Sequence, residues 1–396
     1  MKKTAIISGL LVLSALLSAC AGGKTGTDTT TGTQPVTTAE TKPETIMIKD
    51  PYDMADYVKF SGRTYIEQGA TYFNWSLSGF EFNMVGTGAE ALIVTNLGYG
   101  GSSPANNGML YVIVDCDTEN KKLLELDETS KWYTLAEGLG EGPHNIKVVK
   151  RTEVCYSTAG LEKLRINGEF AEKPATKELK LEFIGDSFTC GDGCYTVGGK
   201  DAYVSVNQDG TVSYAALIAE HYGAELNVTA HCGIGLVWNY AGKTDSDGET
   251  SMAKAYPYVD LFHKGDLQWN FKNYKSDLVV INLGTNDAQY VPRDKNLWIN
   301  SYVEFLKTVR QKNPDAKILC TQGATNCSSP QYMCFDKIAK KAADEGLTDV
   351  YFYTMKNDYD AKTDGQGVGM HPSPAVHKKT ADQLIAEIDR LGLLNK

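Results

Sequence analysis

The chain contains fewer basic than acidic residues. Its 396 positions hold 39 Lys and Arg against 49 Asp and Glu, which gives a formal net charge of −10. A nucleic-acid-binding surface needs a basic patch that neutralises phosphates, so we expect no nucleic-acid partner. After the first twenty residues, no apolar run is long enough to cross a membrane. Since no nucleic-acid partner is expected, we interpret the net negative charge as serving mainly solubility.

A pair of C-x-x-C motifs, which is typical of structural zinc sites, is also missing. Cys190 and Cys194 flank the loop that follows Ser187, so a local disulfide is one hypothesis for an exported protein. Zinc binding is a second hypothesis. Buried free thiols, which an anaerobic source would keep reduced, are the third and the one that we prefer. The cysteines that follow Cys20 are Cys116, Cys155, Cys190, Cys194, Cys232, Cys320, Cys327 and Cys334.

The N-terminus has the pattern of a secretory signal. Two lysines precede an apolar run that ends in Leu17-Ser18-Ala19-Cys20, and the run is too short for a membrane-spanning helix. The small residues before Cys20 resemble a bacterial lipoprotein cleavage site, which implies a lipid on Cys20. An ordinary signal peptide is the alternative. We therefore expect residues 1–20 to be a signal peptide and the protein to be an extracytoplasmic lipoprotein, anchored to the membrane at the bacterial cell surface.

Residues 21–45 have almost no large apolar side chain and are rich in Thr, Gly and Pro. Such a segment cannot bury a core, so we expect a disordered linker. Residues 46–172 then show short alternating runs, for example "GFEFNMVG", "MLYVIVD" and "HNIKVVKR", separated by turn residues. This rhythm, without a useful helical period, predicts an all-β sandwich of jelly-roll type as an accessory domain.

Residues 173–396 have a different rhythm. The strand candidates "LKLEFI", "AELNVTA", "DLVVINL", "AKILCT" and "DVYFY" alternate with amphipathic helical patterns. Ser373 and Pro374 give the last helix a cap and a first turn. Strands that alternate with helices predict an α/β domain with a parallel, flavodoxin-like sheet covered on both faces.

Four polar or flexible residues follow separate strand candidates or precede the last helix. Ser187 follows the first strand, Gly233 the second and Asn286 the central one, and His371 lies just before the last helix. The carboxyl ends of parallel strands share one edge of a sheet, where active sites form. Acyl transfer needs this set, because a base must activate the serine and N–H donors must stabilise the oxyanion.

The motifs "GDSFTCGDG", "HCGIG", "GTND" and "HPS" occur in this order and resemble the blocks of the SGNH (GDSL) hydrolases. Gly62-Arg63 and "LGEGPHNIKVVKRTE" add a similarity to carbohydrate esterase family 2, in which a small β-sandwich precedes the SGNH domain. The resemblance covers nearly all of residues 55–392. It implies removal of O-acetyl groups from plant cell-wall polysaccharides of the xylan or mannan type, without a cofactor or a metal.

The resemblance also implies the catalytic roles. Ser187 would be the nucleophile and His371 the general base, and the N–H groups of Ser187 and Gly233 with the Asn286 side chain would form the oxyanion hole. Many SGNH enzymes carry an acid two or three residues before the histidine, where this chain has Val368 and Gly369. We therefore expect a Ser-His dyad whose imidazole is oriented by a backbone carbonyl. Asp358, Asp360 and Asp364 are the alternative partners, and Cys232 and Trp238 are further departures from the family pattern.

Several neighbouring residues have competing interpretations. His377 is the rival base, although we prefer a role in packing or at the helix surface for it. His231 could line the pocket, but we prefer a satisfied, partly buried histidine. Asp186 and Asp287 flank Ser187 and Asn286, and backbone hydrogen bonds that hold the loops explain them better than a carboxylate pair. For substrate binding we name Trp238, Tyr290 and Asp186. The rings of Trp238 and Tyr290 could stack on sugars, and ordinary core packing is the equal alternative for both. We expect Trp298 to be packed in the core.

The sequence thus predicts a monomeric surface lipoprotein that binds an acetylated polysaccharide or oligosaccharide and deacetylates it. Two alternatives stay open. One is a different short-chain acyl hydrolase of the same fold. The other is a glycan-binding surface lipoprotein without turnover, which the missing acid and the sandwich would permit and the retained Ser187 and His371 oppose.

Overall fold

A computed structural model describes residues 46–96, 104–199, 201–263, 265–323, 333–360 and 362–394. The predicted signal peptide with Cys20, the predicted linker and Cys327 lie outside these described residues. Residues Glu44–Lys396 form one compact unit, in which a β-rich part precedes an α/β part. The boundary between residues 172 and 173 stays a prediction. None of the helices in the described ranges has the length and apolarity to cross a bilayer.

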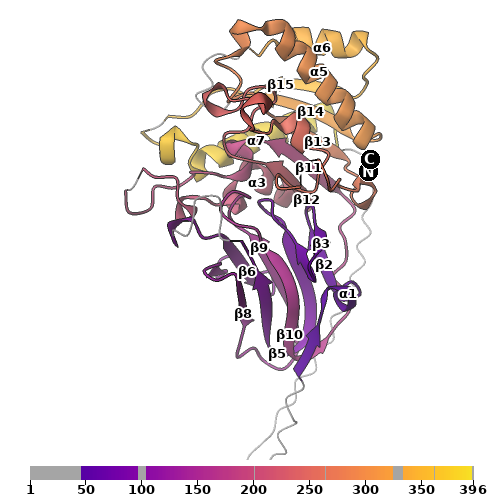
Figure 1. Ribbon diagram of the computed structural model, residues 1–396, viewed down its shortest axis with the longest axis vertical. Coiled ribbons are helices and arrows are strands. Elements are labelled where there is room, and N and C mark those ends of the chain that lie inside the picture. The colour runs from indigo at the N-terminus through magenta and orange to yellow at the C-terminus, as the bar shows by residue number, and fades with distance from the viewer. Residues whose placement is uncertain are drawn as a thin grey trace, which may run out of the picture. The chain divides into compact units, whose positions relative to one another are not determined.

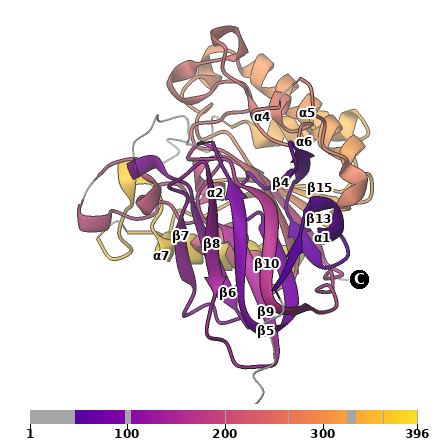
Figure 2. The ribbon, with the colours of Figure 1, turned by 60° about the horizontal axis from the view of Figure 1, so that its bottom comes forward.

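Ten antiparallel strands form the β-rich part (Figures 1 and 2) and share one hydrogen-bonded network. Seven follow the order β3-β4-β10-β5-β9-β6-β7, while β1 pairs with β10, and β2 and β8 pair with β5. The elements are β1 (Ile46–Lys49), α1 (Pro51–Met54), β2 (Val58–Ser61), β3 (Tyr65–Glu67), β4 (Ala70–Tyr72), β5 (Gly79–Val94), β6 (Met109–Val114), β7 (Lys122–Glu125), β8 (Ser130–Ala136), β9 (Pro143–Lys150) and β10 (Gly160–Phe170).

The long strand β5 keeps one face in the core by means of a bulge. Its buried side chains are even-numbered from Phe80 to Met84 but odd-numbered from Ala89 to Ile93. The change occurs around Gly86, where the pairing with β10 shifts register. A Cβ on Gly86 would lie 2.1 Å from the carbonyl oxygen of Asn167, so only glycine fits.

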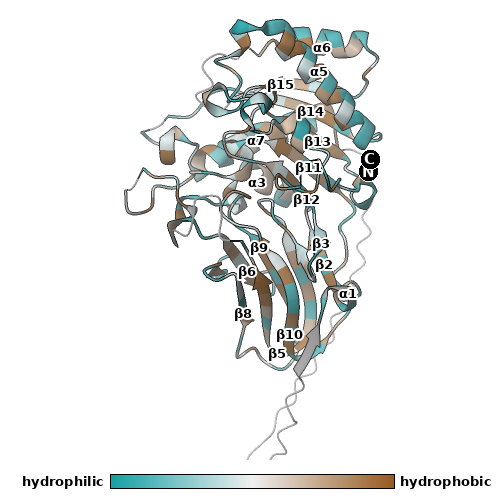
Figure 3. Ribbon diagram, viewed as in Figure 1, coloured by the Kyte–Doolittle hydropathy of each residue, from teal (hydrophilic) through white to brown (hydrophobic). Residues whose placement is uncertain are grey.

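The α/β part contains a parallel sheet in the order β12-β11-β13-β14-β15, which is the flavodoxin-like order that the sequence predicted. Helices α5 and α6 pack on one face, and α3 and α7 pack on the other (Figure 1). Figure 3 shows hydrophobic strands beneath helices with hydrophilic outer faces. The elements are β11 (Lys180–Gly185), α2 (Ser187–Cys190), α3 (Tyr214–His221), β12 (Glu225–Ala230), α4 (Met252–Ala255), β13 (Leu278–Asn282), α5 (Lys295–Lys312), β14 (Lys317–Gln322), α6 (Phe335–Asp344), β15 (Val350–Thr354) and α7 (Pro374–Leu391).

A buried arginine connects the two parts. Arg63 follows β2, is 1% exposed, and donates through Nη2 to Glu182 Oε1 on β11 at 3.0 Å and through Nη1 to the Tyr258 carbonyl at 2.8 Å. Its guanidinium lies 4.7 Å from the ring centre of Tyr256. The preceding residue, Gly62, has a φ of +78° and a hypothetical Cβ only 2.7 Å from Ser78 Cβ, which explains the Gly-Arg pair.

Candidate active site

Ser187 begins the short helix α2, directly after strand β11. A Cβ on Gly185, the last residue of the strand, would lie 1.9 Å from Thr189 Oγ1, so the helix turns tightly against the strand end. The loop after α2 leaves through Gly191, whose φ is +74°. The predicted nucleophile therefore lies at the carboxyl edge of the sheet and keeps 8% of its surface exposed.

Asp186 has a structural position. It caps α2 by accepting the Phe188 N–H at 3.1 Å and is 1% exposed. Burial raises the pKa of Asp186 to about 7, and the hydrogen bond from Phe188 partly offsets this rise. Such a buried cap does not reach into solvent, so the geometry supports the loop-holding interpretation rather than the substrate contact that we also predicted.

The turns after β12 and β13 meet each other. Asn286 Nδ2 donates to the Ile234 carbonyl at 2.8 Å, which places the amide beside the residue that follows Gly233. Gly233 has a φ of +76°, a conformation that glycine adopts without strain. The structure thus brings together the two turns that carry the predicted donors from Gly233 and Asn286.

Asp287 holds this region in place, as predicted. Its carboxylate is fully buried and accepts three backbone N–H groups, from Leu236 at 2.9 Å, Val237 at 2.8 Å and Trp238 at 2.7 Å. Burial raises the pKa of Asp287 to about 6 even though these N–H groups favour the charged form. The residue braces the turn that follows Gly233 and is not one half of a carboxylate pair facing solvent.

His371 packs against the loop that follows Ser187. Its Nδ1 lies 2.7 Å from the Val368 carbonyl oxygen, so an Nδ1–H donates to a backbone carbonyl. The imidazole also lies close to Gly193, where a Cβ would be 3.3 Å from Cγ of the ring, and the Val368 N–H donates to the Gly193 carbonyl at 2.7 Å. These contacts join the loop after Ser187 to the loop that carries His371.

The three aspartates that could have supported the imidazole have other partners. Asp364 accepts from Lys379 Nζ at 2.8 Å, Asp358 accepts from Gln383 Nε2 at 3.1 Å, and Asp360 accepts the Lys362 N–H at 2.8 Å. Among the described residues, the Val368 carbonyl is thus the partner that lies at Nδ1 of His371, and the Ser-His dyad itself stays a prediction.

The rival His377 is a core residue. It is 0% exposed, its Nδ1 accepts the Tyr214 N–H at 3.2 Å, and its ring stacks on Phe188 with centres 4.8 Å apart. Burial lowers the pKa of His377 to about 3, so the ring is neutral in the folded protein at neutral pH. Of the two roles preferred for it, packing and the helix surface, this environment is that of packing.

Because His377 is buried and neutral in the folded protein, we expect the free energy of unfolding to depend on pH. The unfolded chain protonates His377 below about pH 6.5, whereas the folded protein resists protonation down to a pKa of about 3. The contribution of His377 to the free energy of unfolding is fully present above pH 6.5. Between pH 6.5 and 3 it is lost by about 1.4 kcal/mol per pH unit. Urea unfolding between pH 7 and 4 measures this slope, and His377→Gln should show a shallower one. Equal slopes for both proteins would contradict the assignment.

His231 has a partner that the sequence did not reveal. Glu153, from the segment after β9, is fully buried, and its Oε2 lies 2.7 Å from His231 Nδ1 and accepts the Cys232 N–H at 3.0 Å. Burial alone would raise the pKa of Glu153, but His231, Cys155 and the Cys232 N–H together hold it below its ordinary value. Glu153 therefore braces the turn that carries Gly233, and its only sequence signal was its place in the "KRTE" motif.

The aromatic candidates divide into two groups. Trp298 is 0% exposed and donates to the Met333 carbonyl, as expected for core packing. Trp238 is half-buried and lies 6.4 Å, centre to centre, from Tyr290, which is only 9% exposed. The sequence missed two exposed tyrosines at this edge. Tyr203 is 52% exposed and meets the His371 ring edge-on, and Tyr240 is 72% exposed and donates its backbone N–H to Gly233.

None of the seven described cysteines forms a disulfide with another, and this includes Cys190 and Cys194, which are 0% and 1% exposed. Of the three hypotheses, the local disulfide is therefore not formed, and buried thiols account for this pair.

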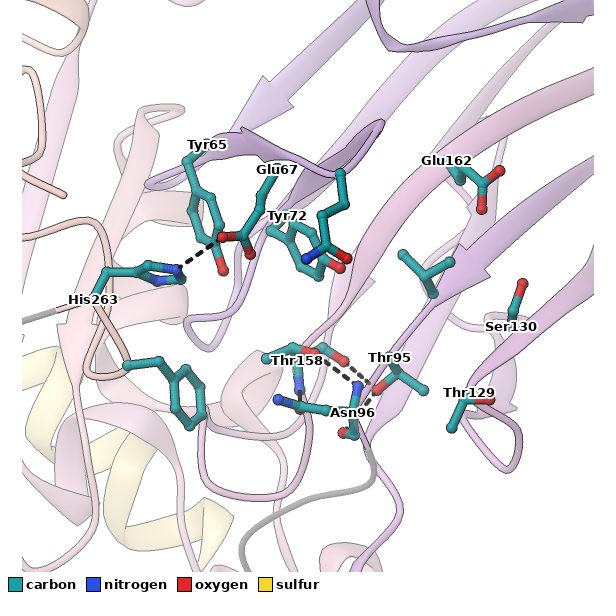
Figure 4. Close-up of a pocket in the computed structure, with 13 residues that line it drawn as sticks. Tyr65, Glu67, Tyr72, Thr95, Asn96, Thr129, Ser130, Thr158, Glu162 and His263 are labelled. Carbon is teal, nitrogen blue, oxygen red and sulfur yellow. Dashed lines mark hydrogen bonds and ion pairs between the residues drawn. The ribbon is translucent and has the colours of Figure 1, made fainter. Parts of the chain in front are cut away.

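A cavity of about 600 Å³ lies elsewhere, beside the hairpin β3–β4 (Figure 4). Tyr65 and Tyr72 stack there with ring centres 5.2 Å apart, and His263 points toward Glu67. The predicted catalytic residues are not among those that line it. Its walls carry mostly hydroxyl, amide and carboxylate groups from Glu67, Gln68, Thr95, Asn96, Thr129, Ser130, Thr158 and Glu162.

Comparison with known proteins identifies the family. The family described as carbohydrate esterase 2 N-terminal matches residues 60–174, and the GDSL-like lipase/acylhydrolase family matches residues 183–379. The structure of a family two carbohydrate esterase from Clostridium thermocellum, in complex with cellohexaose, has a TM-score of 0.74 and 30% sequence identity, over 85% of this chain and 100% of that chain. The chain belongs to carbohydrate esterase family 2.

Two named relatives are similar to this family 2 chain. Cellulase/esterase CelE of Acetivibrio thermocellus is 33% identical over 80% of this chain, which spans only 37% of CelE. An acetylxylan esterase / glucomannan deacetylase of Cellvibrio japonicus is 24% identical over 88% of this chain and 91% of the relative. The family resemblance drawn from the sequence is confirmed, as is the order of a β-rich part followed by a GDSL part.

Proposed function

We propose that this family 2 protein is a carbohydrate O-acetyl esterase that deacetylates plant cell-wall polysaccharide of the xylan or mannan type. The observation that carries the proposal is the meeting of the Ser187 loop with His371, whose Nδ1 is bonded to the Val368 carbonyl. The names of the relatives support an acetylated glycan as the substrate.

In the proposed reaction, Ser187 Oγ attacks the acetyl carbonyl while His371 takes the hydroxyl proton through Nε2, the nitrogen that Val368 leaves available. The N–H groups of Ser187 and Gly233 and the amide of Asn286 stabilise the oxyanion. The imidazolium then gives its proton to the sugar oxygen, which leaves as an alcohol. Water, deprotonated by the same imidazole, releases acetate from Ser187.

Acetate release from acetylated xylan and acetylated glucomannan tests the proposal. We expect release from at least one polymer, and a preference for short over long acyl esters. Activity on long-chain esters or thioesters alone would favour the other acyl hydrolases. An absence of activity on both polymers and on a small aryl acetate would leave the glycan-binding alternative, for which the exposed Tyr203 and Tyr240 provide a surface.

Replacement of Glu153 should slow turnover without weakening substrate binding. Glu153→Gln removes the charge that holds His231 and the Cys232 N–H, and so loosens the turn that carries the Gly233 N–H. We expect kcat to fall by about 10- to 100-fold, no more than the loss of an oxyanion donor itself, with KM nearly unchanged.

The matched control is Glu387→Gln, which removes another buried carboxylate, paired with Arg390 on α7. It should leave both kinetic constants unchanged. A rise in KM without a change in kcat for Glu153→Gln would reject the positioning role.

We also propose that the protein is exported and anchored through a lipid on Cys20, and that it acts as a monomer. The sequence pattern of residues 1–20 supports the export and the anchor. Labelling of cells with radioactive palmitate should mark the wild-type protein and not Cys20→Ala. Labelling of both proteins, or of neither, would reject the anchor, and light scattering of the protein without residues 1–20 measures the oligomeric state.

A further inference from the structure

The carboxylate of Asp192 is buried, and one of its two oxygens accepts no hydrogen bond from any described residue. It lies in the loop after α2, is 2% exposed, and receives a hydrogen bond on Oδ1 from Gln208 Nε2. The other oxygen, Oδ2, is buried and has no hydrogen-bond partner among the residues that the structure describes. A buried carboxylate oxygen in this state is costly, because it has lost water and gained no equivalent donor.

Two other metal-binding side chains surround this carboxylate. An oxygen of Asp192, Sγ of Cys232 and a ring nitrogen of His371 all lie within 4.8 Å of one another. They come from three separate loops, and Cys232 and His371 are only half-buried, so an ion can reach them from solvent. Imidazole, thiolate and carboxylate are the ligand types that Zn²⁺ prefers, and a three-residue set leaves its fourth position open.

A neighbouring triplet serves as an internal comparison. Glu153, Cys155 and His231 also have ligand atoms within 4.8 Å of one another. In that triplet the side chains already hydrogen-bond to one another. Glu153 Oε2 lies 2.7 Å from His231 Nδ1, and Glu153 Oε1 accepts from Cys155 Sγ at 2.9 Å. Both carboxylate oxygens of Glu153 are thus used in a hydrogen-bonded brace. In the Asp192 triplet the Cys232 thiol also interacts with the carboxylate, but Oδ2 of Asp192 has no hydrogen-bond partner among the described residues.

We propose that Asp192, Cys232 and His371 form a binding site for Zn²⁺ or a similar divalent transition metal, and that the bound ion switches the esterase off. On binding, the Cys232 thiol releases its proton to solvent and its sulfur joins the metal. Because Nδ1–H of His371 donates to the Val368 carbonyl, Nε2 is the ring nitrogen left for the ion. The bound cation then occupies the nitrogen that would take the proton of Ser187, so the imidazole can no longer act as the base. The inhibition rests on the proposed function, but the binding does not.

Cobalt titration of Ser187→Ala tests the binding independently of catalysis. Co²⁺ on a thiolate gives a charge-transfer band in the near ultraviolet, and equilibrium dialysis counts the ions. We expect one Co²⁺ per chain with this band in the Ser187→Ala protein. Adding Cys232→Ser should abolish the band and weaken the affinity by at least about tenfold. Adding Cys155→Ser instead, in the satisfied triplet, should preserve the band.

Absence of the band before Cys232 is changed, or its survival after Cys232→Ser, would overturn the proposal. In active protein, Zn²⁺ should inhibit hydrolysis of an aryl acetate, and a chelator should restore it. The Zn²⁺ concentration for half inhibition should rise by at least about tenfold in Cys232→Ser. If the protein hydrolyses no acetate at all, the proposed function fails, and the cobalt result still decides the metal site.

Discussion

Ser187→Ala lowers acetate release by about 10⁴-fold or more, while the protein stays folded. The reason is that the alanine has no oxygen to form the acetyl-enzyme, and the remaining oxyanion donors accelerate only a direct attack by water. The fold has little to lose, because the change deletes one hydroxyl from a residue that starts a four-residue helix. Release of acetate from acetylated xylan, followed for both proteins at equal concentration, measures the effect.

Ser213→Ala is the matched control for this experiment. Ser213 is also buried in the α/β part, where its hydroxyl caps α3 by accepting the Ala216 N–H at 3.3 Å. Its loss should lower the free energy of unfolding by about 1 kcal/mol and leave kcat unchanged. Ser187→Ala should thus lower activity and leave stability unchanged, whereas Ser213→Ala should lower stability and leave activity unchanged. Acetate release by Ser187→Ala within tenfold of the wild type would remove Ser187 from the role of nucleophile.

Arg63→Met is expected to produce the largest loss of stability. Methionine fills a similar volume but leaves the carboxylate of Glu182, 1% exposed, without its cation in the core. It also removes the donor to the Tyr258 carbonyl. Breaking a buried pair by removing one partner costs about 3–5 kcal/mol, because the remaining charge stays buried without its counter-ion. From the described residues Glu182 then keeps only neutral donors, among them the Tyr256 hydroxyl and the Asn227 amide. Urea unfolding gives the free energy difference directly.

Arg165→Met provides the comparison at the surface. Arg165 pairs with Glu90 between β10 and β5, and both side chains are about one-third exposed. Solvent screens this pair, so its loss should cost about 0–1 kcal/mol. A double variant with Glu182→Gln should recover part of the loss seen in Arg63→Met, since the unpaired charge is then gone. Equal costs for Arg63→Met and Arg165→Met would contradict the role assigned to the buried pair.

Local periodicity predicted the elements that position the site. The alternation from Phe80 to Met84 predicted the first half of β5, and the apolar run before Ser187 predicted β11. The apolar runs of β11, β12 and β13 precede Ser187, Gly233 and Asn286. Because parallel strands end at a common edge, these three runs also predicted that the turns after them would meet. The bulge at Gly86 was not predicted, since it depends on the approach of Asn167, which is distant in sequence.

The partners of buried polar groups were harder to predict. Glu153 and Asp192 carry no periodic signal, and the sequence gives no indication that the first braces the Cys232 turn or that the second lies beside His371. Tyr203 and Tyr240 were missed because both lie in irregular segments where exposure follows from the course of the loop. Such contacts depend on tertiary packing, which residue type and spacing do not encode locally.

The connection through Arg63 and Glu153 bears on how such proteins can be recombined. A gene fragment that begins at residue 173 would encode the whole parallel sheet but neither of these side chains. Glu182 would lose its guanidinium, and the Cys232 turn would lose its carboxylate. Residues 173–396 alone therefore lack two side chains on which their buried contacts depend, and we do not expect them to function as a separate module. Any exchange of this segment between genes, natural or engineered, has to carry the strand-rich half along or replace both side chains from another source.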